Sequence, residues 1–192
     1  LGAFRSILIA VQDRALAALA RSLGEQALRP GCVVLHTSGS LSSALLRAEL
    51  PPDVAVGGAH PVYPFSGSHL PDPAGMPLAV EGEAAAVQRA EALAELLGMG
   101  SFRVDSEGKA LYHAGLALLS NGAVALFASA ESMLIQAGVT SAEARPLLLE
   151  LLAATRRNLA EASPLDALTG PIKRGDEQVA AAHMAAVAAA LP

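Results

Sequence analysis

The stretch CVVLHTSGS, residues 32–40, joins an apolar run to a turn of small polar residues. Its first half is rich in β-branched valine, which is typical of a buried strand. Its second half holds serine and glycine, the residues that form tight turns and begin helices. The stretch therefore predicts a buried strand over 32–37 that turns at once toward a helix, the repeating unit of an α/β fold.

The same pattern recurs on both sides of this stretch. Further strands are predicted at 6–11, 54–60, 77–82 and 101–105, and helices at 14–28, 42–50 and 83–97. Asp13 is expected to cap the first of these helices. The segment 61–76 contains prolines and glycines and is expected to form a long irregular loop. Strands that alternate with helices predict a largely parallel sheet over residues 1–105.

From Ser106 onward the strand pattern stops. Helices are predicted over 107–137, 142–161 and 176–190, with the loop SPLDALTGPIKRGD before the last of them and Asp176 as its cap. These helices are apolar on all sides, so they are expected to pack against each other and against a second copy of the chain. The prediction is an α/β domain over 1–105 and an all-helical, homodimer-forming domain over 106–192.

The composition of the chain argues against nucleic-acid and membrane partners and favours a cytoplasmic protein. The chain has 192 residues and a formal net charge of -5 without a basic cluster, which argues against nucleic acid. No uninterrupted apolar run reaches the roughly 18 to 20 residues of a membrane span, since polar residues break the nearest run, 110–130. The single cysteine, Cys32, is expected in the core, and with no visible leader sequence it indicates a cytoplasmic protein.

Polar residues follow several predicted strands. These are Gln12-Asp13, the HTSGS turn at 36–40, His60-Pro61 and Asp105. Ligands of open parallel sheets bind outside the carboxyl ends of the strands, so these residues are candidates for a site. The alternative is that Asp13 and Ser38 only cap helices.

Three residues are candidates for catalysis. His60 is held extended by the following proline, and its imidazole can exchange a proton near neutral pH. Lys109, one of only two lysines, lies one helical turn before His113, so both can reach one ligand. A lysine there can hold a carboxylate or polarise a carbonyl. The alternatives are a structural histidine at position 60 and a lysine whose amino group reaches solvent.

Four motifs in this order, VVLHTSGSLSS, GGAHPVYPF, KALYHAG…LSN and LTGPIKRGD, resemble Rossmann-like proteins with the C-terminal helical domain DUF2520. The chain is more distantly similar to 6-phosphogluconate dehydrogenase, pyrroline-5-carboxylate reductase and prephenate dehydrogenase. This resemblance implies a dimeric oxidoreductase that uses NADP or NAD on a small oxo, hydroxy or imino acid, with its site between the two domains. It also implies that Val11, Asp13, Thr37, Ser38 and Gly39 border the nicotinamide.

The resemblance implies catalytic roles for His60 and Lys109, with His113 in support. Two features depart from the pattern. The dinucleotide fingerprint G-x-G-x-x-G is absent from the sequence, so the chain is expected to begin inside the Rossmann domain. His113 also stands where relatives with K-x-x-x-N carry asparagine.

Two other functions remain open. One is a non-catalytic module for dinucleotide binding or dimerisation, which the absent fingerprint favours. The other is a metal protein that uses His36, His60 and His113, whose neighbours include no carboxylate or cysteine cluster of the usual kind.

Overall fold

A computed structural model describes residues 1–67 and 70–190 of the chain. Ser68 and His69, within the predicted irregular loop, lie outside the described residues. The chain divides into two compact units, Leu1–Ser120 and Asn121–Pro192. This division falls inside one long helix, α4 (Lys109–Gln136), whereas the boundary predicted at 105/106 lies just before that helix begins.

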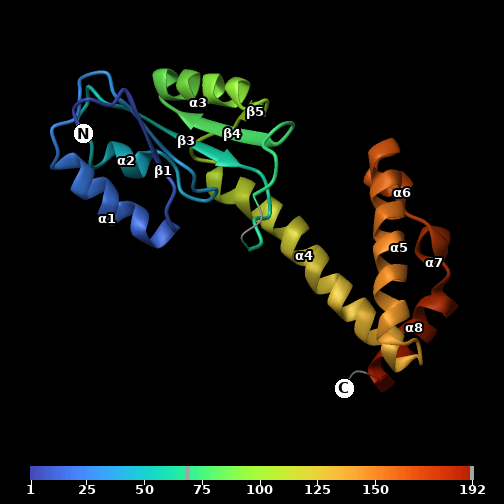
Figure 1. Cartoon of the computed structure of the whole chain (residues 1–192). Coiled ribbons are helices and arrows are strands. Elements are labelled where there is room, and N and C mark those ends of the chain that lie inside the picture. The colour runs from blue at the N-terminus through green and yellow to red at the C-terminus, as the bar shows by residue number, and fades with distance from the viewer. Residues whose placement is uncertain (68–69, 191–192) are drawn as a thin grey trace. The chain divides into compact units, whose positions relative to one another are not determined.

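The first unit contains a five-stranded sheet of the order β1-β2-β3-β4-β5 (Figure 1). Its strands are β1 (Ser6–Ile9), β2 (Val33–His36), β3 (Ala55–Pro61), β4 (Pro77–Gly82) and β5 (Gly100–Arg103). The sequence prediction of all five is confirmed to within one or two residues. Apolar runs bounded by glycine and proline explain why these strands were easy to locate.

The sheet is mostly parallel, with one exception. Strands β1, β2 and β3 run in the same direction, and β4 and β5 share the opposite direction. The antiparallel pair is β3 with β4. A parallel pair requires a crossover, usually a helix, to carry the chain back. The described part of the connection after β3 contains no helix, which is consistent with the antiparallel return.

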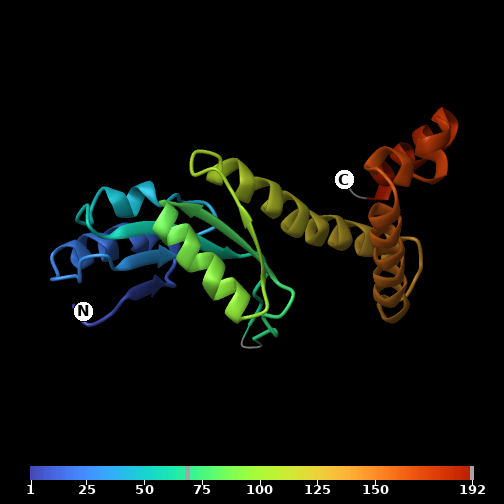
Figure 2. The ribbon, with the colours of Figure 1, turned by 90° about the horizontal axis from the view of Figure 1, so that it is seen from above.

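Helices cover both faces of the sheet. The helices α1 (Asp13–Gly24) and α2 (Ala44–Arg47) lie on one side, and α3 (Ala84–Leu96) lies on the other (Figures 1 and 2). Side chains alternate along β2, so Val34 and His36 face α1 and α2 while Val33 and Leu35 face α3. The two resulting cores are separate clusters of buried apolar side chains.

Two details of the first unit correct the sequence prediction. Asp13 is the first residue of α1 rather than its cap; the cap position is Gln12, and no side chain caps this helix. The helix ends at Gly24, earlier than the predicted residue 28. Cys32 is fully buried in the core, as expected.

The second unit is helical in its described part. It includes the end of α4 and the helices α5 (Ser141–Glu161), α6 (Pro164–Ala167), α7 (Gly170–Arg174) and α8 (Glu177–Ala190). The short helices α6 and α7 lie where the sequence predicted only a loop. Proline stands within the first two residues of each, and Gly175 ends the second. The predicted cap of α8 is confirmed, since the Asp176 carboxylate accepts a hydrogen bond from the Val179 amide at 3.2 Å.

By length and composition alone, α4 is the one described helix that could cross a membrane, and its most apolar 18-residue window has no buried residue. The test for an uninterrupted apolar run missed this helix, because isolated polar residues such as Ser120 count little in an average. The core helix of a soluble protein passes the same test.

Alanine substitutions at two glycines are expected to change the free energy of unfolding in opposite directions. A Cβ at Gly115 or at Gly138 would meet no neighbouring atom, but only Gly138 has a positive φ, of 92°. Alanine at Gly115, inside α4, should raise the free energy of unfolding by about 0.5–1 kcal/mol. Alanine at Gly138 should lower it by about 1 kcal/mol. Urea unfolding of both variants checks the prediction, and equal signs would contradict it.

Candidate functional site

The carboxyl ends of β1, β2 and β3 meet at one edge of the sheet, because these strands are parallel. The start of α4 lies on the α1 and α2 side of the sheet (Figure 1). It is fastened there by Lys109, whose Nζ donates a hydrogen bond to the Ser38 carbonyl oxygen at 2.7 Å. Residues 71 positions apart in sequence are thereby joined at this edge.

Three rings gather at this edge, and we refer to His60, Tyr112 and His113 as the ring cluster. The Tyr112 hydroxyl lies 2.9 Å from His60 Nδ1. The His60 ring is edge-on to both neighbours, with centroid distances of 5.8 Å to Tyr112 and 6.0 Å to His113. All three side chains are half-buried, so they line the surface rather than the core.

Gly39 brings the β2–α2 turn directly against the ring cluster. A Cβ at this position would lie 2.5 Å from His113 Cδ2 and 2.9 Å from both Cε1 and Nε2 of His60. Contacts this short do not occur for real side chains, so only glycine permits the approach. The predicted residues Gly39, His60 and His113 are therefore brought together.

A second set of polar side chains lies nearby, and all of them are buried except the half-buried Ser106. We call His36, Ser43, Glu81, Ser106 and Lys109 the buried network. At its centre is Glu81, which is only 3% exposed. Its carboxylate accepts hydrogen bonds from the Ser43 amide at 3.0 Å, the Ser43 hydroxyl at 2.8 Å and the Ser106 hydroxyl at 2.6 Å. These bonds compensate for much of the cost of burying a carboxylate.

His36 connects the turn after β2 to Glu81. Its Nδ1 accepts a hydrogen bond from the Ser38 amide at 3.2 Å, which assigns the ring proton of the neutral form to Nε2. Nε2 lies 3.6 Å from Glu81 Oε1, too far for a hydrogen bond, and has no other partner among the described residues. His36 is thus held to the backbone of the turn that follows β2.

Lys109 is buried to 1% exposure, so the alternative in which its amino group reaches solvent is wrong. Burial lowers the pKa of Lys109, while the negative charges of Glu81 and Asp13 act in the opposite direction. The ammonium therefore lies within electrostatic reach of both carboxylates. Its Nζ points inward to the Ser38 carbonyl, so the charge of Lys109 lies beneath the surface at the carboxyl ends of these strands.

Two members of the ring cluster, His60 and Tyr112, are uncharged near neutral pH. Burial, and then the positive charge of Lys109, lowers the pKa of His60 to about 4. Burial raises the pKa of the Tyr112 hydroxyl. The His60–Tyr112 contact is thus a hydrogen bond between a neutral imidazole and a neutral phenol, and the tautomer of His60 decides which of them donates.

The remaining predicted residues lie at the ends of β1 and β2. Val11 is 40% exposed just beyond β1. The Thr37 amide and hydroxyl donate to the Ile9 carbonyl at 3.0 and 3.4 Å. Asp13 accepts a hydrogen bond from the Ser40 hydroxyl at 2.7 Å. Although burial acts to raise the pKa of Asp13, hydrogen bonds from Ser40 and Ser38 leave it below its usual value.

Asp105 does not belong to this edge by strand direction, because β5 runs opposite to β1, β2 and β3. Its carboxylate instead accepts a hydrogen bond from the Glu107 amide at 3.2 Å within the turn before α4. Lys173, the other lysine, donates to the Asp166 carbonyl at 2.8 Å.

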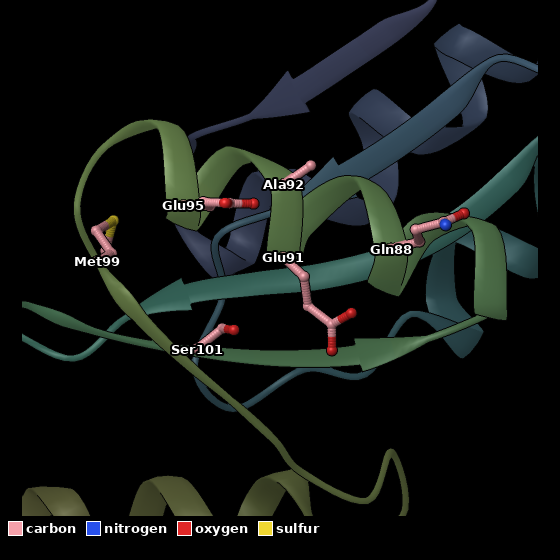
Figure 3. Close-up of a pocket in the computed structure, with 6 residues that line it drawn as sticks. All are labelled: Gln88, Glu91, Ala92, Glu95, Met99 and Ser101. Carbon is pink, nitrogen blue, oxygen red and sulfur yellow. The ribbon is translucent and has the colours of Figure 1, made fainter.

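An open depression of about 460 Å³ lies on the other side of the sheet, between α3 and β5 (Figure 3). It is lined by Gln88, Glu91, Ala92, Glu95, Met99 and Ser101. Glu91 is engaged there by Arg103 at 3.0 Å. None of the predicted site residues lines this depression, so it is separate from the ring cluster. The described residues contain no group of three or more histidine, cysteine or acidic side chains arranged for a metal ion.

Sequence reasoning missed Glu81 and Tyr112 as site residues. A charged residue in the otherwise apolar strand PLAVEG was a usable indication, because carboxylates are seldom buried unless they have partners. Its partners lie 38 and 25 positions away, and the strand order that joins them cannot be read from local patterns. Tyr112 lies one turn from Lys109 on α4, but its partner His60 is 52 positions away on β3.

Acid should destabilise the protein through His36. Burial and the charge of Lys109 lower the pKa of His36 to about 4 in the folded state, against 6.5 for an ordinary histidine. Between these values the unfolded chain binds the proton and the folded chain does not, so stability is lost as pH falls from 6.5 toward 4. The loss attributable to His36 is at most about 3 kcal/mol. Urea unfolding at several pH values measures the loss. His36→Gln should reduce the slope, and part of it should remain because the pKa of His60 is also lowered to about 4. His183→Gln should leave the slope unchanged. An equal slope in all three proteins would contradict the prediction.

Comparison with known proteins gives a family and a fold. Residues 76–191 match the family described as Domain of unknown function (DUF2520). This match covers well over half of the chain. Among curated proteins, none matches the sequence.

Solved structures share the fold across nearly the whole chain. A provisionally named NADP oxidoreductase of Bacteroides fragilis has a TM-score of 0.76 at 24% identity, over 96% of this chain and 68% of the other. A protein of Thermotoga maritima has a TM-score of 0.72 at 27% identity, over 90% of this chain and 65% of the other. The 1-pyrroline-5-carboxylate reductase of Streptococcus pyogenes has a TM-score of 0.60 at 14% identity, over 90% of this chain and 61% of the other. The chain spans about two thirds of the length of these proteins and shares their Rossmann-like fold.

Proposed function

The chain belongs to the DUF2520 family, and from this premise we propose that it is part of an NADP- or NAD-dependent dehydrogenase or reductase that acts on a small oxo, hydroxy or imino acid. The observation that carries the proposal is the ring cluster, held against Gly39 at the carboxyl edge of three parallel strands. This edge is where open α/β sheets bind their ligands. Groups that exchange protons at this edge suit a reaction that moves a hydride and a proton together.

The residues at this edge fit one end of a nicotinamide cofactor. The exposed apolar side chain of Val11 and the polar residues Asp13, Thr37 and Ser38 stand beside the close backbone approach at Gly39. When bound, the nicotinamide supplies or accepts the hydride. A glycine-rich turn for the phosphates is absent from the sequence, so these residues would border the nicotinamide half alone.

The remaining chemistry belongs to the chain's own side chains. His60 exchanges the proton that accompanies the hydride, and its low pKa keeps it neutral and able to accept. The buried ammonium of Lys109 stabilises negative charge that develops on the substrate oxygen. His113 packs edge-on against His60 and helps to hold its ring in place. In this proposal residues 1–105 complete a cofactor-binding domain, and 106–192 form the helical domain.

The proposal includes a homodimer formed through the helices that follow β5. In the described part of the second unit only Ala144 and Leu148 are buried, while large apolar residues on α5 and α8 are exposed. So few buried side chains do not form a core that stabilises a helical unit. A second copy of the chain is the proposed cover, and analytical ultracentrifugation without detergent tests it. A monomer, or a protein soluble only in detergent, would contradict the dimer.

Cofactor binding tests the proposed function directly. Protein of full natural length is titrated with NADPH and with NADH while nicotinamide fluorescence is followed. We expect saturable binding of at least one of them, and binding of neither removes the oxidoreductase proposal. Turnover of 2-oxo acids should fall about 100-fold in His60→Ala. The control His183→Ala, on the exposed helix α8, should retain it.

A second function is a dinucleotide-binding or dimerisation module without turnover. It is favoured by one observation, namely that the Lys109 ammonium is engaged by Ser38 and buried. Saturable cofactor binding without oxidation of NADPH by any substrate tested would favour this function over the enzyme.

A further inference from the structure

Tyr112 occupies a position in the ring cluster that the proposed function has so far not used. Its hydroxyl contacts His60 Nδ1 at 2.9 Å, and its ring packs edge-on against Phe102 with centroids 6.2 Å apart. Lys109 Nζ lies 6.0 Å from the centre of the same ring. The Tyr112 ring thus has a hydrogen-bonding partner in His60, an aromatic neighbour in Phe102 and a nearby ammonium in Lys109.

We propose that Tyr112 is a further catalytic residue, which donates the proton to the substrate oxygen or nitrogen and is resupplied by His60. This inference rests on the proposed function. It assigns the two members of the hydrogen bond different roles, with the phenol in contact with substrate and the imidazole behind it.

The geometry of His60 suits this division of roles. Its Nδ1 faces Tyr112, while its Nε2 lies on the side of the turn at Gly39. In the tautomer that carries the proton on Nδ1, the imidazole donates to the Tyr112 oxygen, and the phenolic O–H is free to point at a ligand. The opposite tautomer would make Tyr112 donate to His60 and leave no proton for the substrate.

The proposed reduction balances in atoms and electrons. The substrate carbon receives a hydride from a dihydronicotinamide, and the electron pair of its C=O or C=N double bond moves to the oxygen or nitrogen. That atom takes the phenolic proton, which leaves a phenolate on Tyr112. The phenolate takes the proton from His60 Nδ1, and Nε2 takes one proton from solvent. Proton exchange with water restores the starting tautomer before the next turnover.

The chain's other tyrosine provides a matched control. Tyr63 is 44% exposed on the segment after β3 and packs against Phe65 rather than against His60. Tyr112→Phe and Tyr63→Phe each remove one hydroxyl and keep the ring. NADPH oxidation is followed at saturating cofactor with glyoxylate, pyruvate and a cyclic imino acid as probes. We expect kcat to fall about 100-fold or more in Tyr112→Phe, with the Kd for NADPH unchanged, and to stay near the wild-type value in Tyr63→Phe.

Two results separate this inference from the function on which it rests. A wild-type protein that oxidises no NADPH with any probe overturns both. An active wild type with kcat in Tyr112→Phe within threefold of normal overturns only the role of Tyr112.

Imidazole nitrogen NMR tests the pair without turnover. The relay predicts the His60 proton on Nδ1 in the wild type and in Tyr63→Phe, and a shift toward the other tautomer in Tyr112→Phe. A proton found on Nε2 in the wild type would overturn the relay even in an active enzyme.

Discussion

Glu81→Gln lowers the free energy of unfolding by about 3 kcal/mol, the largest loss of stability that we expect from any single change in the buried network. The carboxylate accepts three hydrogen bonds and is 3% exposed. Its charge also favours the ammonium form of the buried Lys109. The amide keeps the shape but leaves that ammonium without its main counter-charge, and its NH₂ group cannot accept the serine hydroxyl bonds.

Glu83→Gln is the matched control. Glu83 pairs with Arg47 at 2.9 Å, but its side chain is 42% exposed, so the loss should stay within about 1 kcal/mol. The double variant Glu81→Gln with Lys109→Met removes both buried charges and should recover part of the loss. Chemical denaturation of the four proteins measures these values. Equal losses for positions 81 and 83 would mean that the network does not fasten α4 to the sheet.

Gly39→Ala is expected to have the largest effect on turnover among changes that add a single carbon. The new Cβ would lie 2.5 Å from the His113 ring and 2.9 Å from the His60 ring, so both imidazoles or the turn must move. A displacement of about 1 Å in a catalytic group costs about 100-fold in rate. The crowding should also lower the free energy of unfolding by about 1–3 kcal/mol.

Gly100→Ala is the control for this change, since a Cβ there meets no neighbouring atom and φ is not positive. Steady-state NADPH oxidation and urea unfolding are measured for both variants. If Gly39→Ala retains normal turnover, the ring cluster is not the reacting surface. If both variants lose turnover equally, the effect is not specific to the contact at Gly39.

The strands could be predicted closely because each is a short apolar run that ends at glycine, proline or a polar turn. The direction of β4 could not, because it depends on the path of the segment after β3 rather than on the residues of β4. The helices α6 and α7 were missed for a related reason: at four and five residues they are too short for a periodic pattern.

Sequence predicted a site residue correctly where a suitable residue type follows the end of a predicted strand, as for His60 and Gly39. Lys109 became a candidate because lysine is rare in this chain. Its inward direction could not be predicted, because any residue has a backbone carbonyl and nothing in the sequence distinguishes that of Ser38. Glu81 is the clearest omission. Its importance comes from two serines that only the folded chain brings to it.

The central claim is that the edge formed by β1, β2 and β3, together with the start of α4, binds the nicotinamide beside His60 and His113. The most direct measurement is imidazole NMR of protein of full natural length during titration with NADPH. The account predicts saturable shifts of the His60 and His113 resonances and an unchanged resonance for His183 on α8. Saturable NADPH binding that leaves His60 and His113 unchanged would contradict it.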